Sequence, residues 1–271
     1  MTVQAQFMPN EPISMRTRSV DELFRAMKRI VTTYPCGIYA DGSEWGVKPI
    51  QEPFPYLKGT AFFPGGYGVW RADPTMPAPS IPVEGTLFVG HNFDGTESEA
   101  KRGDGPNRID ELDSDTWQGM LAILGDLELK IAYDRCFFTN ALMGERIGEA
   151  AGSVRVGRGA DGRRYLHQCE AFLRLQIRWT RPKVLVVLGA QTIARFRAIS
   201  RDLHVTWQGC GSLVKIDEAS ASIVGAAVDR HCCTVVIIPH PVAWPNRKGY
   251  DVGADRIRKL RAAFDHAAAR E

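Results

Sequence analysis

The sequence lacks the features that mark several large classes of protein. It has no apolar run of the roughly 18 residues that a membrane-spanning helix needs, and residues 1–19 lack the apolar core of a secretion signal. Neither sign of charge dominates, because 34 Lys and Arg residues stand against 31 acidic ones, a net charge of +3. We therefore expect a cytoplasmic protein without a membrane partner, whose basic surfaces can arise only from local clustering.

Motifs of several catalytic classes are also missing. The six cysteines form no CxxC pair and no Cys/His cluster at metal-ligand spacing, so we expect reduced thiols, no metal and no cofactor. No Gly-x-Ser-x-Gly elbow occurs, and no Gly-rich phosphate motif follows a strand. These two absences count against a small-molecule α/β hydrolase, which is one of three functional hypotheses and the one that the sequence supports least. The other two are given below, after the motifs on which they depend.

What is present is a regular alternation of buried strands and amphipathic helices. With 271 residues, 44% of them hydrophobic, the chain can bury a sizeable core. Short apolar runs rich in β-branched residues predict four buried strands, at 86–89, 135–142, 184–188 and 234–238. A helix is expected after each of them. The order predicts an α/β fold, a three-layer α/β/α sandwich with a central four-stranded, mainly parallel sheet.

The first third of the chain has a different character. Residues 1–83 are expected to form an N-terminal helix and an irregular extension packed on the core, and residues 84–271 the α/β/α domain. Val20–Tyr34 has helical spacing behind Ser19, a suitable N-cap. Pro35–Pro82 is rich in Gly, Pro and aromatic residues, which indicates irregular structure with a hairpin near Gly65. A further small hairpin is expected within 204–216.

Polar side chains follow three of the four predicted strands. Gly90 ends the first strand and leads into the turn His91, Asn92, Phe93, Asp94. Asn140 ends the second strand, and His240 follows the fourth. The carboxyl ends of parallel strands meet at one edge of a sheet, where open α/β folds bind their ligands. The alternative is that Asn and Gly serve only the backbone geometry of tight turns.

In these places the chain resembles the uracil-DNA glycosylase superfamily. GHNFDG at 90–95 is similar to the Gly-x-Asn motif of its mismatch-specific and single-strand-selective branches, and FFTNAL at 137–142 to the strand whose Asn reads uracil. RPKVLVVLGAQT at 181–192 resembles the third strand of the iron-sulphur branch, and IPHPVAWPNR at 238–247 its closing His-Pro motif. The four motifs occur in the family's order across residues 84–265. Only Cys169 matches one of the four cluster cysteines, which indicates a divergent, cluster-free member.

The resemblance implies a site that hydrolyses the N-glycosidic bond of uracil in DNA. Such a site needs a positioned water and a hydrogen-bond donor aimed at the departing base, which gains negative charge. Asn92 or Asp94 would hold the water, and His240 would donate to uracil O2. The Asn140 amide offers both an acceptor for N3–H and a donor for O4. Phe93 is the candidate for stacking on the flipped base.

Gly90 and His91 complete the expected substrate-binding turn. His91 can equally be a structural histidine that happens to lie beside the pocket.

The partner would be DNA containing uracil, bound by a monomer that releases free uracil. Trp244 could wedge into the base stack, while phosphates would meet the polar residues that follow it, Asn246, Arg247 and Lys248. Residues 144–164 are expected to form a basic loop, whose phosphate-binding candidates are Arg158, Arg163 and Arg164. A plain solvated loop and a packed Trp are the alternatives.

A catalytically inactive or base-trapping protein of the same fold is the second functional hypothesis. The family has Pro where this chain has Phe93, and Ser where it has Val242. Such a protein would grip DNA or free uracil without cleaving the glycosidic bond.

Overall fold

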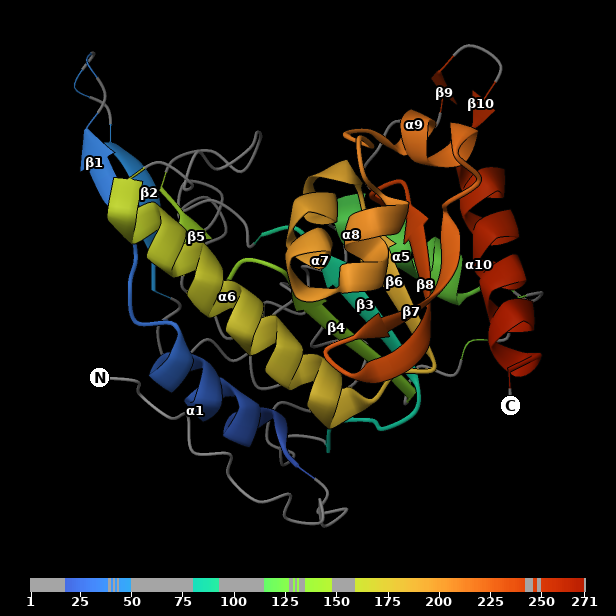
Figure 1. Cartoon of the computed structure of the whole chain (residues 1–271), viewed down its shortest axis with the longest axis horizontal. Helices are drawn as coiled ribbons and strands as arrows, with labels where there is room; N and C mark the ends of the chain where they lie inside the picture. The colour runs from blue at the N-terminus through green and yellow to red at the C-terminus, as the bar shows by residue number, and fades with distance from the viewer. Residues whose placement is uncertain are drawn as a thin grey trace, which may run out of the picture.

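The computed structural model describes residues 18–38, 40, 42, 44–49, 80–92, 115–126, 129, 131, 135–147, 159–241, 246–247 and 250–270. Its centre is a five-stranded sheet in the order β4-β3-β6-β8-β7 (Figure 1). The strands are β3 (Thr86–Gly90), β4 (Cys136–Asn140), β6 (Val184–Leu188), β7 (Ile223–Val228) and β8 (His231–Ile238). β4, β3, β6 and β8 are parallel, so the predicted fold class and its four parallel strands are confirmed.

The fifth strand, β7, was not predicted from the sequence. It pairs antiparallel with β8 through a tight hairpin whose two turn residues, Asp229 and Arg230, have φ of 47° and 67°. Such turns usually carry Asn-Gly or Asp-Gly, because those residues tolerate positive φ. Because Asp-Arg is not a usual turn pair, the sequence did not indicate this hairpin. β8 begins at His231 rather than at the predicted Thr234.

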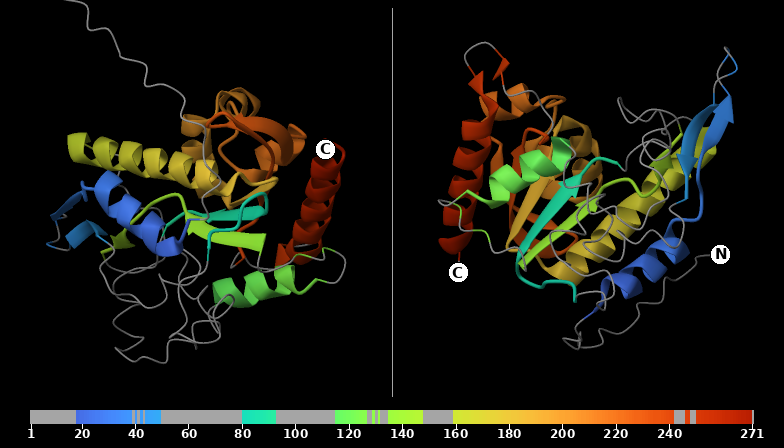
Figure 2. Two further views of the ribbon diagram at one scale, coloured as in Figure 1. Left: turned by 90° about the horizontal axis from the view of Figure 1, so that it is seen from below. Right: turned by 180° about the vertical axis from the view of Figure 1, so that it is seen from behind.

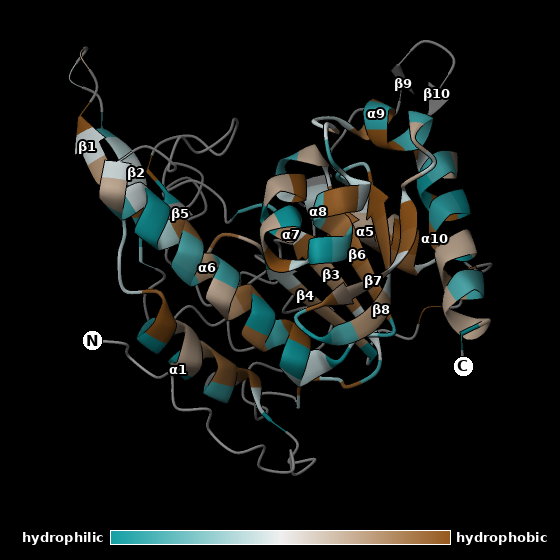
Figure 3. Cartoon of the chain, in the orientation of Figure 1, coloured by the Kyte–Doolittle hydropathy of each residue, from teal (hydrophilic) through white to brown (hydrophobic). Residues whose placement is uncertain are grey.

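Two layers of helices cover the sheet, as the side chains of each strand alternate between its faces. One face, with Leu87 and Val89, packs in the core beneath α6 (Gly159–Thr180), α7 (Ile193–Ile199) and α8 (Arg201–Thr206). The other face, with Phe88 and Phe138, packs against α5 (Asp115–Leu124) and α10 (Val252–Ala268). Figure 2 shows the resulting three layers, and Figure 3 the hydrophobic strands between helices with hydrophilic outer faces.

The N-terminal extension packs on α6 through α1 (Val20–Ile30). Ser19 caps this helix as predicted: its hydroxyl accepts from the Glu22 amide, and the Glu22 carboxylate accepts from the Ser19 amide. The helix ends at Ile30, before the predicted Tyr34. The next segment forms a hairpin of β1 (Cys36–Ile38) and β2 (Glu44–Lys48), which β5 (Glu145–Arg146) extends. The predicted hairpin near Gly65 lies outside the described residues.

Three sequence predictions are wrong in detail. The predicted 144–164 loop contains β5 and the start of α6, so Arg163 and Arg164 are helical and exposed. The single helix expected after the 184–188 strand is interrupted at Ser200, which has an extended backbone and whose hydroxyl caps the start of α8. The predicted 204–216 hairpin is instead the end of α8 followed by α9 (Leu213–Glu218).

Several short elements complete the described chain. A 3₁₀ turn, η3 (Ala190–Thr192), links β6 to α7, and β9 (Asn246–Arg247) pairs with β10 (Tyr250–Asp251) before α10. None of the helices among the described residues is long and apolar enough to span a membrane.

The close approach of the chain at the start of β3 can be tested at Gly85. A Cβ atom there would overlap the carbonyl oxygen of Arg135, which immediately precedes β4, whereas a Cβ at Gly211 would meet nothing within 4 Å. We expect Gly85→Ala to lower the free energy of unfolding by about 1–3 kcal/mol, as overpacking does. Gly211→Ala, the control, should change it by less than about 0.5 kcal/mol. Urea unfolding measures both, and equal effects would contradict the tight β3–β4 start.

Candidate functional site

The path of the chain through the sheet singles out the gap between β3 and β6. From β3 the chain continues through α5 to β4, the neighbour of β3 on one side, whereas from β6 it continues through α7 toward β7 and β8 on the other side. Connections that leave two adjacent parallel strands in opposite directions open a crevice at the carboxyl ends of those strands, and α/β proteins bind ligands there. The residues at this switch point are the turn Gly90–Asn92 after β3 and Gly189 after β6.

Backbone pairing brings the predicted polar residues to the same edge. Gly90 is the register partner of Asn140, and the Leu142 amide donates to the His91 carbonyl at 2.9 Å. On the other side, the Gly189 amide donates to the Ile238 carbonyl at 2.9 Å, two residues before His240. The structure therefore gathers His91, Asn92, Asn140 and His240 from the ends of three strands.

Asn140 is the most enclosed of these side chains. It is the last residue of β4 and only 2% exposed. By strand alternation it shares a sheet face with Phe138, toward α5, and its register partner Gly90 adds no side chain beside it. A buried amide must have its donor and acceptor satisfied, so such a group is costly unless it serves a fixed partner or a ligand.

His91 and His240 are both neutral at pH 7. Burial, followed by the charges of Arg195 and His240, lowers the pKa of His91 to about 4. Burial, followed by the charge of Arg256, lowers the pKa of His240 to about 4. His91 Nδ1 is also buried and has no hydrogen-bond partner among the described residues. This orphaned atom at the crevice makes His91 a stronger ligand-contacting candidate than its sequence context suggests.

Two arginines, Arg195 and Arg256, contact or electrostatically influence the site, and no sequence motif indicated either of them. Arg195 in α7 forms a salt bridge with Glu170 of α6, with 2.6 Å between Arg195 Nη1 and Glu170 Oε1. After burial, the charge of Arg195 is the next cause of the lowered pKa of His91. Arg256 in α10 donates hydrogen bonds to three successive carbonyls, those of Pro239, His240 and Pro241. Arg195 follows the 181–192 motif by three residues and Arg256 follows the 238–247 motif by nine, but neither belongs to a motif, so only the packing of α7 and α10 reveals them.

Two glycines let neighbouring elements approach the His240 turn closely. Gly189 has a φ of +79°, and a Cβ there would lie 3.4 Å from His240 Cβ. A Cβ on Gly119 of α5 would lie 2.8 Å from the Pro241 carbonyl oxygen, closer than side chains tolerate. The turn that presents His240 is therefore enclosed by β6, α5 and α10.

Several predicted site residues cannot be placed around this edge. Phe93, Asp94, Trp244, Lys248 and Arg158 lie outside the described residues. For Asn246 and Arg247 the structure gives only the backbone, which pairs with β10. Arg163 and Arg164 are exposed in the second turn of α6, which is the next helix along the chain after β4.

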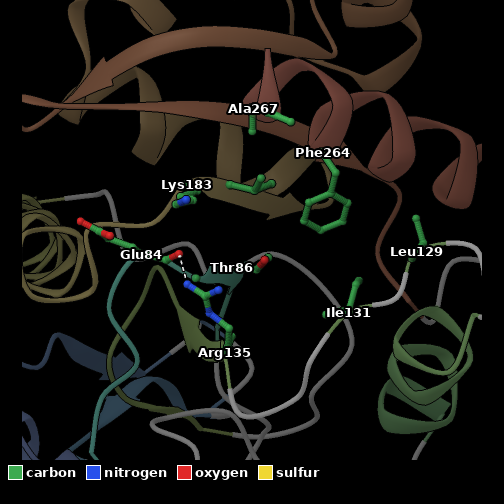
Figure 4. A pocket seen from close by; sticks show the side chains of 11 residues that line it. Glu84, Thr86, Leu129, Ile131, Arg135, Lys183, Phe264 and Ala267 are labelled. Carbon is green, nitrogen blue, oxygen red and sulfur yellow. Dashed lines mark hydrogen bonds between the residues drawn. The ribbon is translucent and has the colours of Figure 1, made fainter. Parts of the chain in front are cut away.

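A different hollow lies at the opposite, amino-terminal edge of the sheet. It has a volume of about 360 Å³ and is lined by the starts of β3 and β6 and the last turns of α10. Phe264 and Arg135 point into it, and Arg135 donates to the Glu84 carbonyl at 3.0 Å (Figure 4). Because α/β sheets place their chemistry at carboxyl ends, we assign the candidate site to the other edge.

Comparisons with known proteins do not add to this geometry. The chain matches no model of a protein family, and a search of curated proteins finds no match. Among the described residues, no three His, Cys, Asp or Glu side chains are grouped so that they could hold a metal ion.

The lowered pKa of His91 predicts how stability depends on pH. An unfolded chain protonates histidine near pH 6.5, whereas folded His91 takes up its proton only near pH 4. Between these values the unfolded state binds more protons, so acidification favours unfolding. We expect His91→Asn to lose less stability than the wild type between pH 7 and pH 5, measured by urea unfolding.

His204 provides the matched control, because it is exposed in α8. His204→Asn should keep the wild-type pH dependence. If His91→Asn keeps it too, the imidazole of His91 is not buried as described.

Proposed function

We propose that the chain is a monofunctional uracil-DNA glycosylase, a divergent member of the superfamily that its motifs resemble. It would hydrolyse the N-glycosidic bond of uracil in DNA and leave an abasic site and free uracil. The observation that carries the proposal is the meeting of a Gly-x-Asn turn, a buried asparagine amide and a neutral histidine at the switch point of the sheet. Each supplies one group that this hydrolysis needs.

His240 would serve the departing base. As the glycosidic bond breaks, electrons move to uracil and its O2 gains negative charge, so a donor placed there stabilises the transition state more than the ground state. A neutral imidazole can donate one N–H, and the low pKa of His240 keeps the ring neutral at physiological pH. The enclosure of its turn by β6, α5 and α10 supports a fixed donor rather than a mobile one.

Asn140 would read the base. Uracil presents an N3–H donor beside an O4 acceptor, and an asparagine amide carries the complementary pair. The enclosure of Asn140 suits this role, because water competes poorly for a buried amide. His91, with its buried and unpartnered Nδ1, is a second group that could contact the base or an ordered water.

Asn92 would position the attacking water, since it occupies the Asn position of the Gly-x-Asn motif that follows β3. Asp94 is the alternative and would be the stronger base. Hydrolysis places the water oxygen on the sugar C1′ as the base leaves with the electrons of the glycosidic bond. The water's proton goes to solvent if Asn92 positions the water, or to the carboxylate if Asp94 does. Orientation of the water alone can lower the barrier substantially.

The DNA backbone would lie across the same edge. Arg163 and Arg164 project from the part of α6 that follows β4, and Arg158 precedes them in sequence. On the β8 side, the chain continues from His240 to the candidates Trp244, Asn246, Arg247 and Lys248. Phosphate contacts of this kind would hold the register of the DNA without reading its sequence.

The decisive experiment is single-turnover cleavage of a uracil-containing oligonucleotide in the presence of a chelator, followed by alkali. Wild type should produce strand breaks at uracil, and His240→Ala should be slower by about 10² to 10³, the usual worth of one such donor. His204→Ala, on exposed α8, should retain the wild-type rate. Tight binding without breaks would favour the base-trapping alternative.

Asn140→Asp tests how the base is read. The substitution replaces a donor and an acceptor by two acceptors, so uracil O4 would face a carboxylate. We expect uracil excision to fall by roughly 10² to 10⁴, the range for a mismatched hydrogen-bonding site. Circular dichroism should show that the variant is folded. An unchanged rate would reduce Asn140 to a structural residue at the end of β4.

A further inference from the structure

Arg256 makes an unusual set of contacts for a helical arginine. Its Nε donates to the Pro239 carbonyl at 3.1 Å, and its Nη2 donates to the Pro241 carbonyl at 3.2 Å and to the carbonyl of His240. The side chain is buried, at 8% exposure. One guanidinium from α10 thus binds three successive carbonyls in the turn that follows β8.

The sequence of this turn explains why it needs an outside donor. β8 ends at Ile238, so the carbonyls of residues 239–241 no longer pair within the sheet. Two of the three residues, Pro239 and Pro241, have no N–H with which to stabilise a turn of their own. A buried carbonyl without a donor is destabilising, and the planar guanidinium supplies several donors in fixed directions.

Burial is the larger cause of the lowered pKa of His240, and the charge of Arg256 is the second. The charged or titratable groups that act on this imidazole include Arg256 from α10 and His91 from the end of β3. The neighbouring elements α5 and β6 present Gly119 and Gly189 to the turn. A fixed positive charge on the backbone side of His240 disfavours a second positive charge on its ring.

We infer that Arg256 is a positioning residue, which holds the 239–241 turn so that His240 presents a neutral imidazole to the crevice. It acts through the backbone and does not itself touch a substrate. Its placement of His240 is a property of this chain, whereas its effect on catalysis rests on the proposed glycosylase function. Both aspects can be measured separately.

The first measurement is an NMR pH titration of the His240 imidazole. In wild type its pKa should be about 4. Arg256→Gln should raise this pKa toward the ordinary value, while Arg258→Gln should leave it unchanged because Arg258 is on the same helix but pairs with Asp255. An Arg256→Gln titration that coincides with wild type would overturn the inference.

Arg256→Lys provides a second test of the role of Arg256 if Arg256→Gln does not fold. Lysine retains the charge, but a single ammonium cannot reproduce the planar fork that reaches three carbonyls. We expect the pKa of His240 to stay low while single-turnover excision slows by about 10²-fold, the effect of a small misplacement of a reacting group. Wild-type excision by Arg256→Lys would show that positioning is not its role.

A double variant decides whether Arg256 acts through His240. In a His240→Ala background, Arg256→Lys should cause little further loss, since the group it positions is gone. Multiplied losses would mean that Arg256 acts by another route. If wild type itself fails to excise uracil, the proposed function fails, yet the titration still decides whether Arg256 contributes to the low pKa of His240.

Discussion

The parallel pairing of β3 with β4 and β6, and of β6 with β8, is the constraint on which the rest of this structure depends. In-register pairing aligns Gly90 with Asn140 and Leu188 with Ile238, so the chain leaves all four strands at one edge. Because the chain continues from β3 to β4 on one side and from β6 toward β8 on the other, the switch point of the sheet lies between β3 and β6. Among the described residues, Asn92, Asn140 and His240 are brought to one edge by this register.

Much of the fold could be predicted because its signals are local. The four parallel strands are short, fully buried apolar runs, and Ser19 with Glu22 marks the start of α1 by a capping box. The errors occur where local signals mislead. The Asp229–Arg230 hairpin lacks a turn-forming Gly, and the glycines at 209 and 211 indicated a hairpin where α8 gives way to α9.

The candidate site was predictable only in part, for a physical reason. Asn92, Asn140 and His240 each follow a strand directly, so sequence and topology suffice to bring them together. Arg195 and Arg256 reach the same edge from α7 and α10, and only tertiary packing reveals them. The neutrality of both histidines is likewise a result of burial and of these two charges, which no motif encodes.

The most direct test of the central claim, that ligand binding belongs to the carboxyl-terminal edge, is an amide NMR titration with free uracil, the product of the proposed reaction. The account predicts chemical-shift changes concentrated at the described residues of that edge, Gly90, Asn92, Asn140, Gly189 and His240. Residues of the opposite hollow, such as Lys183 and Ala267, provide the internal control. Changes confined to that hollow, or none at millimolar uracil, would contradict the account.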